Sequence, residues 1–118
     1  GVPRALPGLI RALRVGEKAA RAGFDFDNAN QALAKLREEV DELDQARDER
    51  AQREELGDLL FAAVNVARKL NIDPEEALRE ALDKFSARFS RVEEAAQGKL
   101  PELSFDDKEA LWEAAKQP

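Results

Sequence analysis

The feature of this sequence that most restricts its fold is the recurrence of apolar residues at spacings of three and four. Leu33, Leu36, Val40 and Leu43 follow this spacing, and the segment 56–70 repeats it. Such spacing places the apolar side chains on one face of an α-helix. No segment shows the alternating pattern of a half-buried strand. The sequence therefore predicts an all-α fold.

Capping and turn residues mark where the helices begin and end. Pro7 suits a first helical position, Gly23 suits a left-handed end, and Asn28 and Asp73 are good N-caps. The polar stretch 47–53 is compatible with either a turn or exposed helix. The expected helices cover residues 7–22, 28–47, 52–70 and 73–98, followed by a short helix opened by Ser104. Four longer helices joined by short loops indicate a four-helix-bundle-like domain with an additional short C-terminal helix.

Length and charge limit the number of domains and the kinds of partner that we expect for the protein. The 118 residues suit one domain, 1–118, and the absence of methionine leads us to expect a processed chain, a fragment, or one half of a longer tandem protein. The net charge of −6 without a clustered basic face argues against a nucleic-acid partner. No apolar run approaches the roughly 20 residues that span a bilayer, and no secretory signal is present. We expect a cytoplasmic protein without a membrane partner, and a homodimer or higher homo-oligomer.

The chain contains neither cysteine nor histidine. Disulfides, zinc sites built from Cys and His, and Ser-His triads are therefore excluded. Any metal must be held by oxygen, which favours Mg²⁺, Mn²⁺ or Ca²⁺.

Two pairs of carboxylates have the spacing that brings side chains to one helix face. Glu39 and Glu42 are three residues apart, as are Glu55 and Asp58, and each pair borders an apolar stripe. If the two helices pack together, four carboxylates converge, and a hard divalent cation would relieve their repulsion. Either pair alone is more simply explained as a solvated acidic face. However, Asp58 and Gly57 are weak helix formers inside a helix, and Gly57 fits close packing against that helix.

The acidic residues and their neighbours resemble a known family. Glu38-Glu39-Val40-Asp41-Glu42 and Glu55-Leu56-Gly57-Asp58 are similar to the E-E-x-x-E and E-x-x-D motifs of the MazG family, which belongs to the all-α nucleoside triphosphate pyrophosphohydrolases. The segments 6–13, 22–26, 54–61 and 71–78 also resemble the C-terminal MazG domain.

This resemblance implies Mg²⁺-dependent hydrolysis of nucleoside and deoxynucleoside triphosphates to the monophosphate and pyrophosphate, in nucleotide-pool house-cleaning. Mn²⁺ is an alternative metal. The metal ligands that it implies are Glu39, Glu42, Glu55 and Asp58. The further contacts that it implies are Lys35 and Glu38 with the triphosphate, Lys84 and Arg88 with the nucleotide, and Trp112 and Lys116 near the base or ribose.

Several of these roles also follow from the residues themselves. Lys84 and Arg88 are four apart and form a basic patch suited to phosphate oxygens, or an ordinary exposed pair. Trp112 suits stacking on a base or core packing. Asn65 suits a hydrogen bond to a sugar or base, or to its own helix. For catalysis, we expect Glu38 or another carboxylate to orient the attacking water.

One segment departs from the family pattern. The family carries a phosphate-contacting lysine one turn before the second motif, whereas this chain has Arg50-Ala51-Gln52-Arg53. Arg50 or Arg53 would have to replace that lysine. Two alternatives to the broad activity are a narrower pyrophosphohydrolase for dCTP, dUTP or phosphoribosyl-ATP, and a non-catalytic helical module that binds cations.

Overall fold

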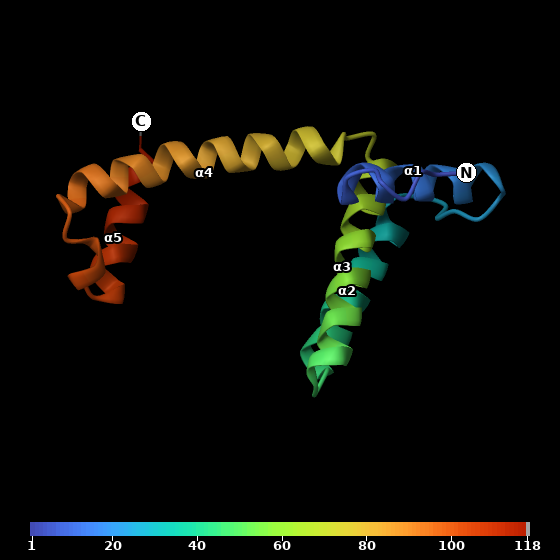
Figure 1. Ribbon diagram of the computed structural model, residues 1–118, viewed down its shortest axis with the longest axis horizontal. Coiled ribbons are helices and arrows are strands. Elements are labelled where there is room, and N and C mark those ends of the chain that lie inside the picture. Colours follow the sequence, from blue (N-terminus) through green and yellow to red (C-terminus); the bar gives the residue numbers. More distant parts are fainter. Residues whose placement is uncertain (118) are drawn as a thin grey trace. The chain divides into compact units, whose positions relative to one another are not determined.

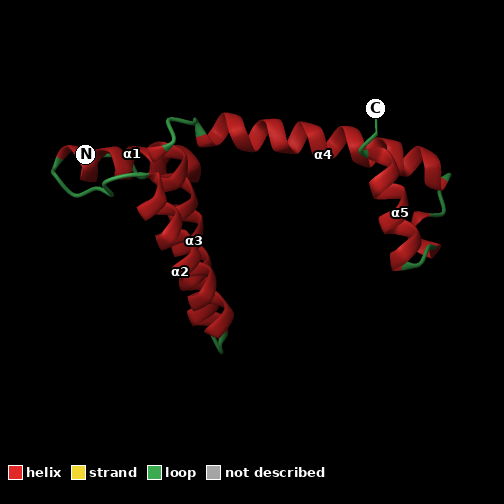
Figure 2. Cartoon of the chain, turned by 180° about the vertical axis from the view of Figure 1, so that it is seen from behind, coloured by secondary structure: helices red, strands yellow, loops and turns green. Residues whose placement is uncertain are grey.

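The computed structural model describes residues 1–117 and contains helices and loops only in that part of the chain (Figure 2). This confirms the predicted all-α class and the short C-terminal helix. Figure 1 shows the order of the elements along the chain. The helices are α1 (Gly8–Arg21), α2 (Ala29–Gln45), α3 (Glu49–Lys69), α4 (Pro74–Ala96), the 3₁₀ turn η1 (Leu100–Glu102) and α5 (Phe105–Ala115).

The helix starts follow the predicted capping residues closely. Asn28 accepts a hydrogen bond from the backbone N–H of Gln31 at 2.9 Å, and Ser104 accepts one from Asp107 at 3.1 Å. Asp73 accepts from the N–H groups of Glu75 and Glu76, at 2.9 and 3.4 Å, which opens α4. These bonds satisfy N–H groups that a helix leaves without intrahelical partners.

The third helix begins earlier than the predicted residue 52. Asp48 accepts a hydrogen bond from the N–H of Ala51 at 2.8 Å, and α3 therefore starts at Glu49. Most of the undecided stretch 47–53 is thus helix. At other ends, Gly23 has the predicted left-handed φ of +94°, and α4 stops at Ala96, just before Gln97 and Gly98 with φ of +49° and +79°.

The chain divides into two compact units, of which the first covers Gly1–Ala77. Its α2 and α3 are joined by residues 46–48 and pack side by side in opposite directions (Figure 1). The buried apolar side chains of these two helices are small and include Ala32 and Ala62. Larger residues of the predicted stripe, such as Leu56 and Leu60, remain about half exposed.

Helix α1 packs against α3 at a glycine. Gly16 is buried, and a Cβ atom at this position would lie 2.7 Å from Oδ1 of Asn65 and 3.0 Å from Nε of Arg68. Glycine inside a helix costs about 1 kcal/mol relative to alanine. Here the absent side chain makes room for two polar groups of α3.

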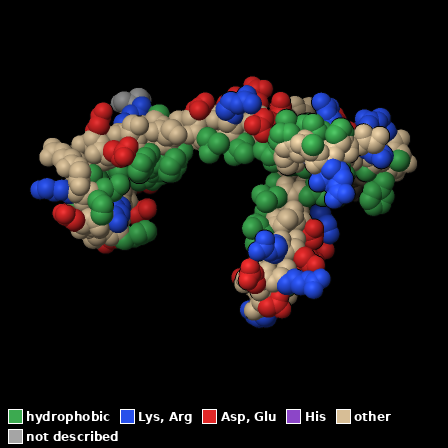
Figure 3. Space-filling view, in the orientation of Figure 1, with side chains coloured by type: hydrophobic (Ala, Val, Ile, Leu, Met, Phe, Trp, Pro, Cys, Tyr) green, Lys and Arg blue, Asp and Glu red, His purple; other side chains and the backbone are tan. Residues whose placement is uncertain are grey.

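The second unit begins at Leu78 and contains most of α4, together with η1 and α5. Phe85 of α4 lies 5.2 Å from the Trp112 ring of α5, centroid to centroid, and Arg91 donates a hydrogen bond to the carbonyl of Ala115 at 2.7 Å. Hydrophobic side chains gather along one side of α4 (Figure 3). No helix within residues 1–117 has the length and apolarity needed to span a membrane.

Candidate active site

Three of the four predicted metal ligands converge where α2 packs against α3. Carboxylate oxygens of Glu39 and Glu42, from α2, and of Glu55, from α3, all lie within 4.8 Å of one another. The i, i+3 spacing places the two glutamates of α2 on one face, and the helix pairing brings Glu55 opposite them. We call these three residues the carboxylate triad.

The carboxylate triad includes buried oxygens whose hydrogen-bonding capacity is not met. Glu39 is only 4% exposed, and its Oε2 and the Oε2 of Glu55 are buried without a hydrogen-bond partner among the described residues. A carboxylate cannot accept a hydrogen bond from another carboxylate unless one of them carries a proton. The triad therefore requires a shared proton or a bound cation, and its all-oxygen donor set fits a hard divalent metal.

The electrostatic state of Glu55 reflects this crowding. A hydrogen bond with Glu42 is the main cause that raises the pKa of Glu55 to about 7, and partial desolvation and the Glu42 charge add to it. Two neighbouring carboxylates commonly divide in this way, one keeping its proton while the other ionises. Glu55 is thus the carboxyl group of the triad that holds a proton up to about neutral pH.

Lys35 supplies positive charge to the same face of α2. Its ammonium lies 3.1 Å from Oε1 of Glu39 and 3.6 Å from Oε1 of Glu38. The hydrogen bond to Glu39 raises the pKa of Lys35, so the side chain stays charged. Glu38 itself is exposed.

Asp58, the fourth predicted ligand, does not belong to the carboxylate triad. It is exposed and lies on the wall of an adjoining cavity of about 480 Å³, which Lys35 and Glu39 also line. Further along α3, Phe61, Ala62 and Asn65 face the same cavity. The full wall, which comes entirely from the first unit, consists of Gly16, Ala19, Phe24, Asp25, Phe26, Lys35, Glu39, Asp58, Phe61, Ala62, Asn65 and Arg68.

Asp25 and Arg68 form an ion pair in this wall that the sequence did not reveal. Arg68 donates from Nη2 and Nη1 to the two oxygens of Asp25 at 2.6 and 3.1 Å, and Lys69 donates to Asp25 at 3.1 Å. The hydrogen bond from Arg68 is the main reason that the pKa of Asp25 lies well below its usual range. Gly16, a glycine inside a helix, was the one local signal of a close approach here.

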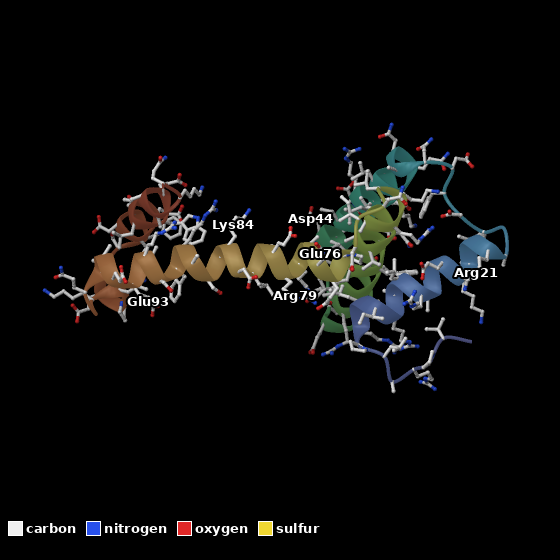
Figure 4. All side chains as sticks on the ribbon, turned by 90° about the horizontal axis from the view of Figure 1, so that it is seen from above. Arg21, Asp44, Glu76, Arg79, Lys84 and Glu93 are labelled. Atoms are coloured by element: carbon white, nitrogen blue, oxygen red, sulfur yellow. The ribbon has the colours of Figure 1, made fainter. Side chains whose placement is uncertain are left out.

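Four predicted substrate contacts lie in the second unit. Lys84 projects from the exposed surface of α4 (Figure 4), and the guanidinium carbon of Arg88 lies 5.9 Å from the centre of the Trp112 ring. Lys116 pairs with Glu113 at 3.0 Å. The contact between Arg88 and Trp112 combines a cation with an aromatic face, a pairing suited to a phosphate next to a ring.

Two further expectations concern the start of α3. Arg53 pairs with Glu49 at 3.0 Å on the exposed surface, and Arg50 is exposed as well. Close packing at Gly57 is not found, since within the described residues nothing lies within 4 Å of a Cβ atom built there.

The fold and the site together define an all-helical domain with a carboxylate triad between two packed helices. Residues 27–92 match the MazG nucleotide pyrophosphohydrolase domain, and the chain belongs to this family.

Curated relatives resemble the chain over most of its length. It is 43% identical to the nucleoside triphosphate pyrophosphohydrolase/pyrophosphatase MazG of Thermotoga maritima, over 94% of this chain and 45% of that protein. It is 39% identical to the nucleoside triphosphate pyrophosphohydrolase of Escherichia coli K12, over 98% of this chain and 47% of that protein. An uncharacterized protein of Bacillus subtilis, YabN, is 50% identical over 53% of this chain and 14% of its own length. The chain thus spans about half the length of the first two relatives.

Proposed function

We propose that this chain hydrolyses nucleoside and deoxynucleoside triphosphates to the monophosphate and pyrophosphate, in a reaction that depends on Mg²⁺. The observation that carries this proposal is the carboxylate triad, with its buried and unpartnered oxygens of Glu39 and Glu55, in a chain of the MazG family. The names of the Thermotoga maritima and Escherichia coli relatives support the reaction. Removal of unwanted triphosphates from the nucleotide pool is the role that we propose.

Glu39, Glu42 and Glu55 would hold the metal, and Asp58, on the neighbouring wall, would complete the set of ligands. Mg²⁺ takes carboxylate and phosphate oxygens, and Mn²⁺ is the closest substitute. When bound, the metal polarises phosphoryl oxygens and lowers the charge repulsion around the attacked phosphorus. Lys35 keeps its positive charge beside Glu39 and would bind a phosphate oxygen.

In the proposed reaction, a water oxygen attacks the α-phosphorus and forms the new P–O bond. The bond between that phosphorus and the oxygen bridging to the β-phosphorus breaks, and pyrophosphate leaves with the bridging oxygen. We assign Glu38 as the group that orients the water and takes its proton, because Glu38 is exposed and lies beside Lys35. Lys84 and Arg88 are proposed phosphate contacts, and Trp112 and Lys116 are proposed contacts near the base or ribose.

The decisive assay measures release of pyrophosphate and monophosphate across the common nucleoside and deoxynucleoside triphosphates, with Mg²⁺ and with EDTA. We expect turnover with Mg²⁺ only. Glu39→Gln removes a proposed direct ligand of the metal. Its activity should therefore fall by more than roughly 100-fold, which is the loss caused by removing an outer-shell partner of a metal. Turnover on one nucleotide alone would indicate a narrower pyrophosphohydrolase.

A matched control removes a carboxylate that lies outside the triad. Glu54 precedes Glu55 on α3 and is exposed, so Glu54→Gln should retain activity. Two results contradict the proposal: full activity in Glu39→Gln or Asp58→Asn, or no turnover of any triphosphate by the wild-type chain.

We also propose that the chain works as a homo-oligomer, most simply a dimer. Val40, Leu56 and Leu60 in the first unit are each about half exposed, as are Leu82 and Phe85 in the second. Apolar side chains gathered in this way commonly mark interaction surfaces. Sedimentation equilibrium should give twice the mass of the chain, whereas a concentration-independent monomer would refute this proposal.

A further inference from the structure

The side chains that line the cavity beside the carboxylate triad change in chemical character along α3. Asp58, with Lys35 and Glu39, provides charge in one part of the wall, and Asn65 lies seven residues further along the helix. At 1.5 Å per residue, the two positions are about 10 Å apart along the helix axis. Aromatic and small apolar side chains also line the wall: Phe24, Phe26, Phe61, Ala19 and Ala62. The charged Asp25 and Arg68 in the same wall are paired with each other. A charged part for phosphate and metal thus adjoins a part suited to a flat, largely apolar group.

Asn65 is the uncharged polar side chain of this cavity, and Arg68 orients its amide. The residue is 9% exposed, and its Oδ1 accepts a hydrogen bond from Nε of Arg68 at 3.4 Å. A guanidinium can only donate hydrogen bonds, so the atom that faces it must be the amide oxygen. The Nδ2 group is thereby directed away from Arg68, and Asn65 itself lines the cavity.

Arg68 is itself held in place by a chain of contacts. Its two terminal nitrogens donate to Asp25 in a bidentate pair. The side chain of Arg68 is only 13% exposed and that of Asp25 only 23%. Such paired, charge-assisted bonds fix the plane of a guanidinium. Gly16 closes the other side, where a methyl group would collide with Oδ1 of Asn65. Asp25, Arg68 and Gly16 therefore act as positioning residues for the amide of Asn65.

We propose that this cavity takes the base of the nucleotide and that Asn65, oriented by Arg68 and Asp25, donates an N–H to a ring carbonyl of that base. This inference rests on the proposed hydrolysis of nucleoside triphosphates. An N–H donor in the cavity wall suits an oxo group and disfavours an amino group, which would point its own hydrogens at the donor. The cavity therefore selects bases that carry an oxo group at the edge facing Asn65.

ITP and ATP are the sharpest pair of probes, since their purine rings differ at position 6 by an oxo against an amino group. We expect the wild-type chain to show a kcat/KM about tenfold higher for ITP than for ATP, which corresponds to one hydrogen bond. In Asn65→Ala the ratio should fall to near one, mainly through loss on ITP. A wild-type ratio of one, or an unchanged ratio in Asn65→Ala, overturns the inference.

The positioning role is tested separately from folding. Asp25→Asn keeps the shape of the side chain but weakens its bonds to Arg68, and it should lower the ratio of ITP to ATP by severalfold. Arg14→Gln, which removes the exposed pair of Arg14 with Glu17 on α1, should leave the ratio unchanged. Melting temperatures measured in parallel show whether each variant is folded. If both variants move the ratio equally, or if Asp25→Asn is folded and keeps the wild-type ratio, the positioning role is wrong.

Binding without turnover distinguishes failure of this inference from failure of the proposed reaction. In EDTA, IMP should raise the melting temperature of the wild-type chain more than AMP does, and Asn65→Ala should abolish the difference. If IMP stabilises the chain more than AMP does but no triphosphate is hydrolysed, the proposed reaction is refuted and the base site is still supported. Turnover of triphosphates with equal effects of IMP and AMP would refute the base site alone.

Discussion

The ammonium of Lys35 lies 3.1 Å from Oε1 of Glu39, one helical turn further along α2. Glu39 is buried, and Lys35 is the only charged partner that it has outside the carboxylate triad among the described residues. The lysine therefore offsets part of the negative charge that the triad concentrates at the helix seam.

Lys35→Met should destabilise the metal-free protein and strengthen its response to Mg²⁺. We expect the free energy of unfolding in EDTA to fall by about 1 kcal/mol, a modest loss because the lysine side chain is half exposed. With the lysine gone, the triad is more negative, so saturating Mg²⁺ should restore most of the loss. Urea denaturation with and without Mg²⁺ measures both effects. Arg37→Met, on the exposed surface of the same helix, is the control, and an equal loss there would count against the specific role of Lys35.

The raised pKa of Glu55 predicts how the stability of the metal-free protein changes with pH. Its pKa is about 7 in the folded protein against an ordinary 4.5, so between these values the folded state binds the proton more tightly than the unfolded state. This contribution to stability is fully present below pH 4.5 and is lost as the pH rises through about 7.

Glu55→Gln removes this titration and so isolates its contribution. In EDTA, the difference in unfolding free energy between the variant and the wild type should shift in favour of the variant from pH 5 to pH 8. Urea denaturation at four pH values gives the difference directly. A difference that stays constant over this range would show that Glu55 does not share its proton with Glu42.

The same proton should compete with the metal. Because Glu55 must ionise to bind a cation, affinity for Mg²⁺ should rise steeply from pH 5.5 to about pH 7 and level off above it. Isothermal titration calorimetry in buffers of different ionisation heat would count the protons released. Glu54→Gln should preserve this profile, and binding that is equally tight at pH 5.5 and 8 would contradict the assignment of Glu55 as a ligand.

Two glycines of the first unit should respond to alanine with opposite signs. Gly57 is inside α3 and has open space around it, so Gly57→Ala should stabilise the protein by about 0.5–1 kcal/mol. Gly16→Ala gains the same helix propensity but places a methyl group 2.7 Å from Asn65, so it should destabilise by about 1–3 kcal/mol. Thermal unfolding of both variants checks the prediction. Stabilisation by Gly16→Ala would mean that the contact between α1 and α3 is looser than the structure indicates.

Local features of the fold were predictable because they depend on neighbouring residues. Asn28, Asp73 and Ser104 cap their helices as expected, since a capping side chain reaches only two or three residues along the chain. Asp48 was missed because it lies in a stretch where every residue is polar or alanine, which gave no apolar pattern to mark the start of α3.

The candidate site was predictable only in part. The helix wheel brought Glu39, Glu42 and Glu55 to one seam, but the position of Asp58 depends on how the seam is rotated, which spacing alone does not determine. The pair of Asp25 and Arg68 joins residues 43 positions apart. No local pattern encodes such a contact, which follows from the packing of α1 and its following loop against α3.

The alignment of Glu55, Asp58, Asn65 and Arg68 along α3 has a consequence for how such a domain can diverge. Each residue inserted into or deleted from a helix rotates everything beyond it by about 100°. A single deletion between Asp58 and Asn65 would turn the amide away from the carboxylates although Asp58 and Asn65 themselves are unchanged. Changes in length are therefore tolerable in the connection 46–48 but not within α3, where new specificities must arise by substitution at constant length.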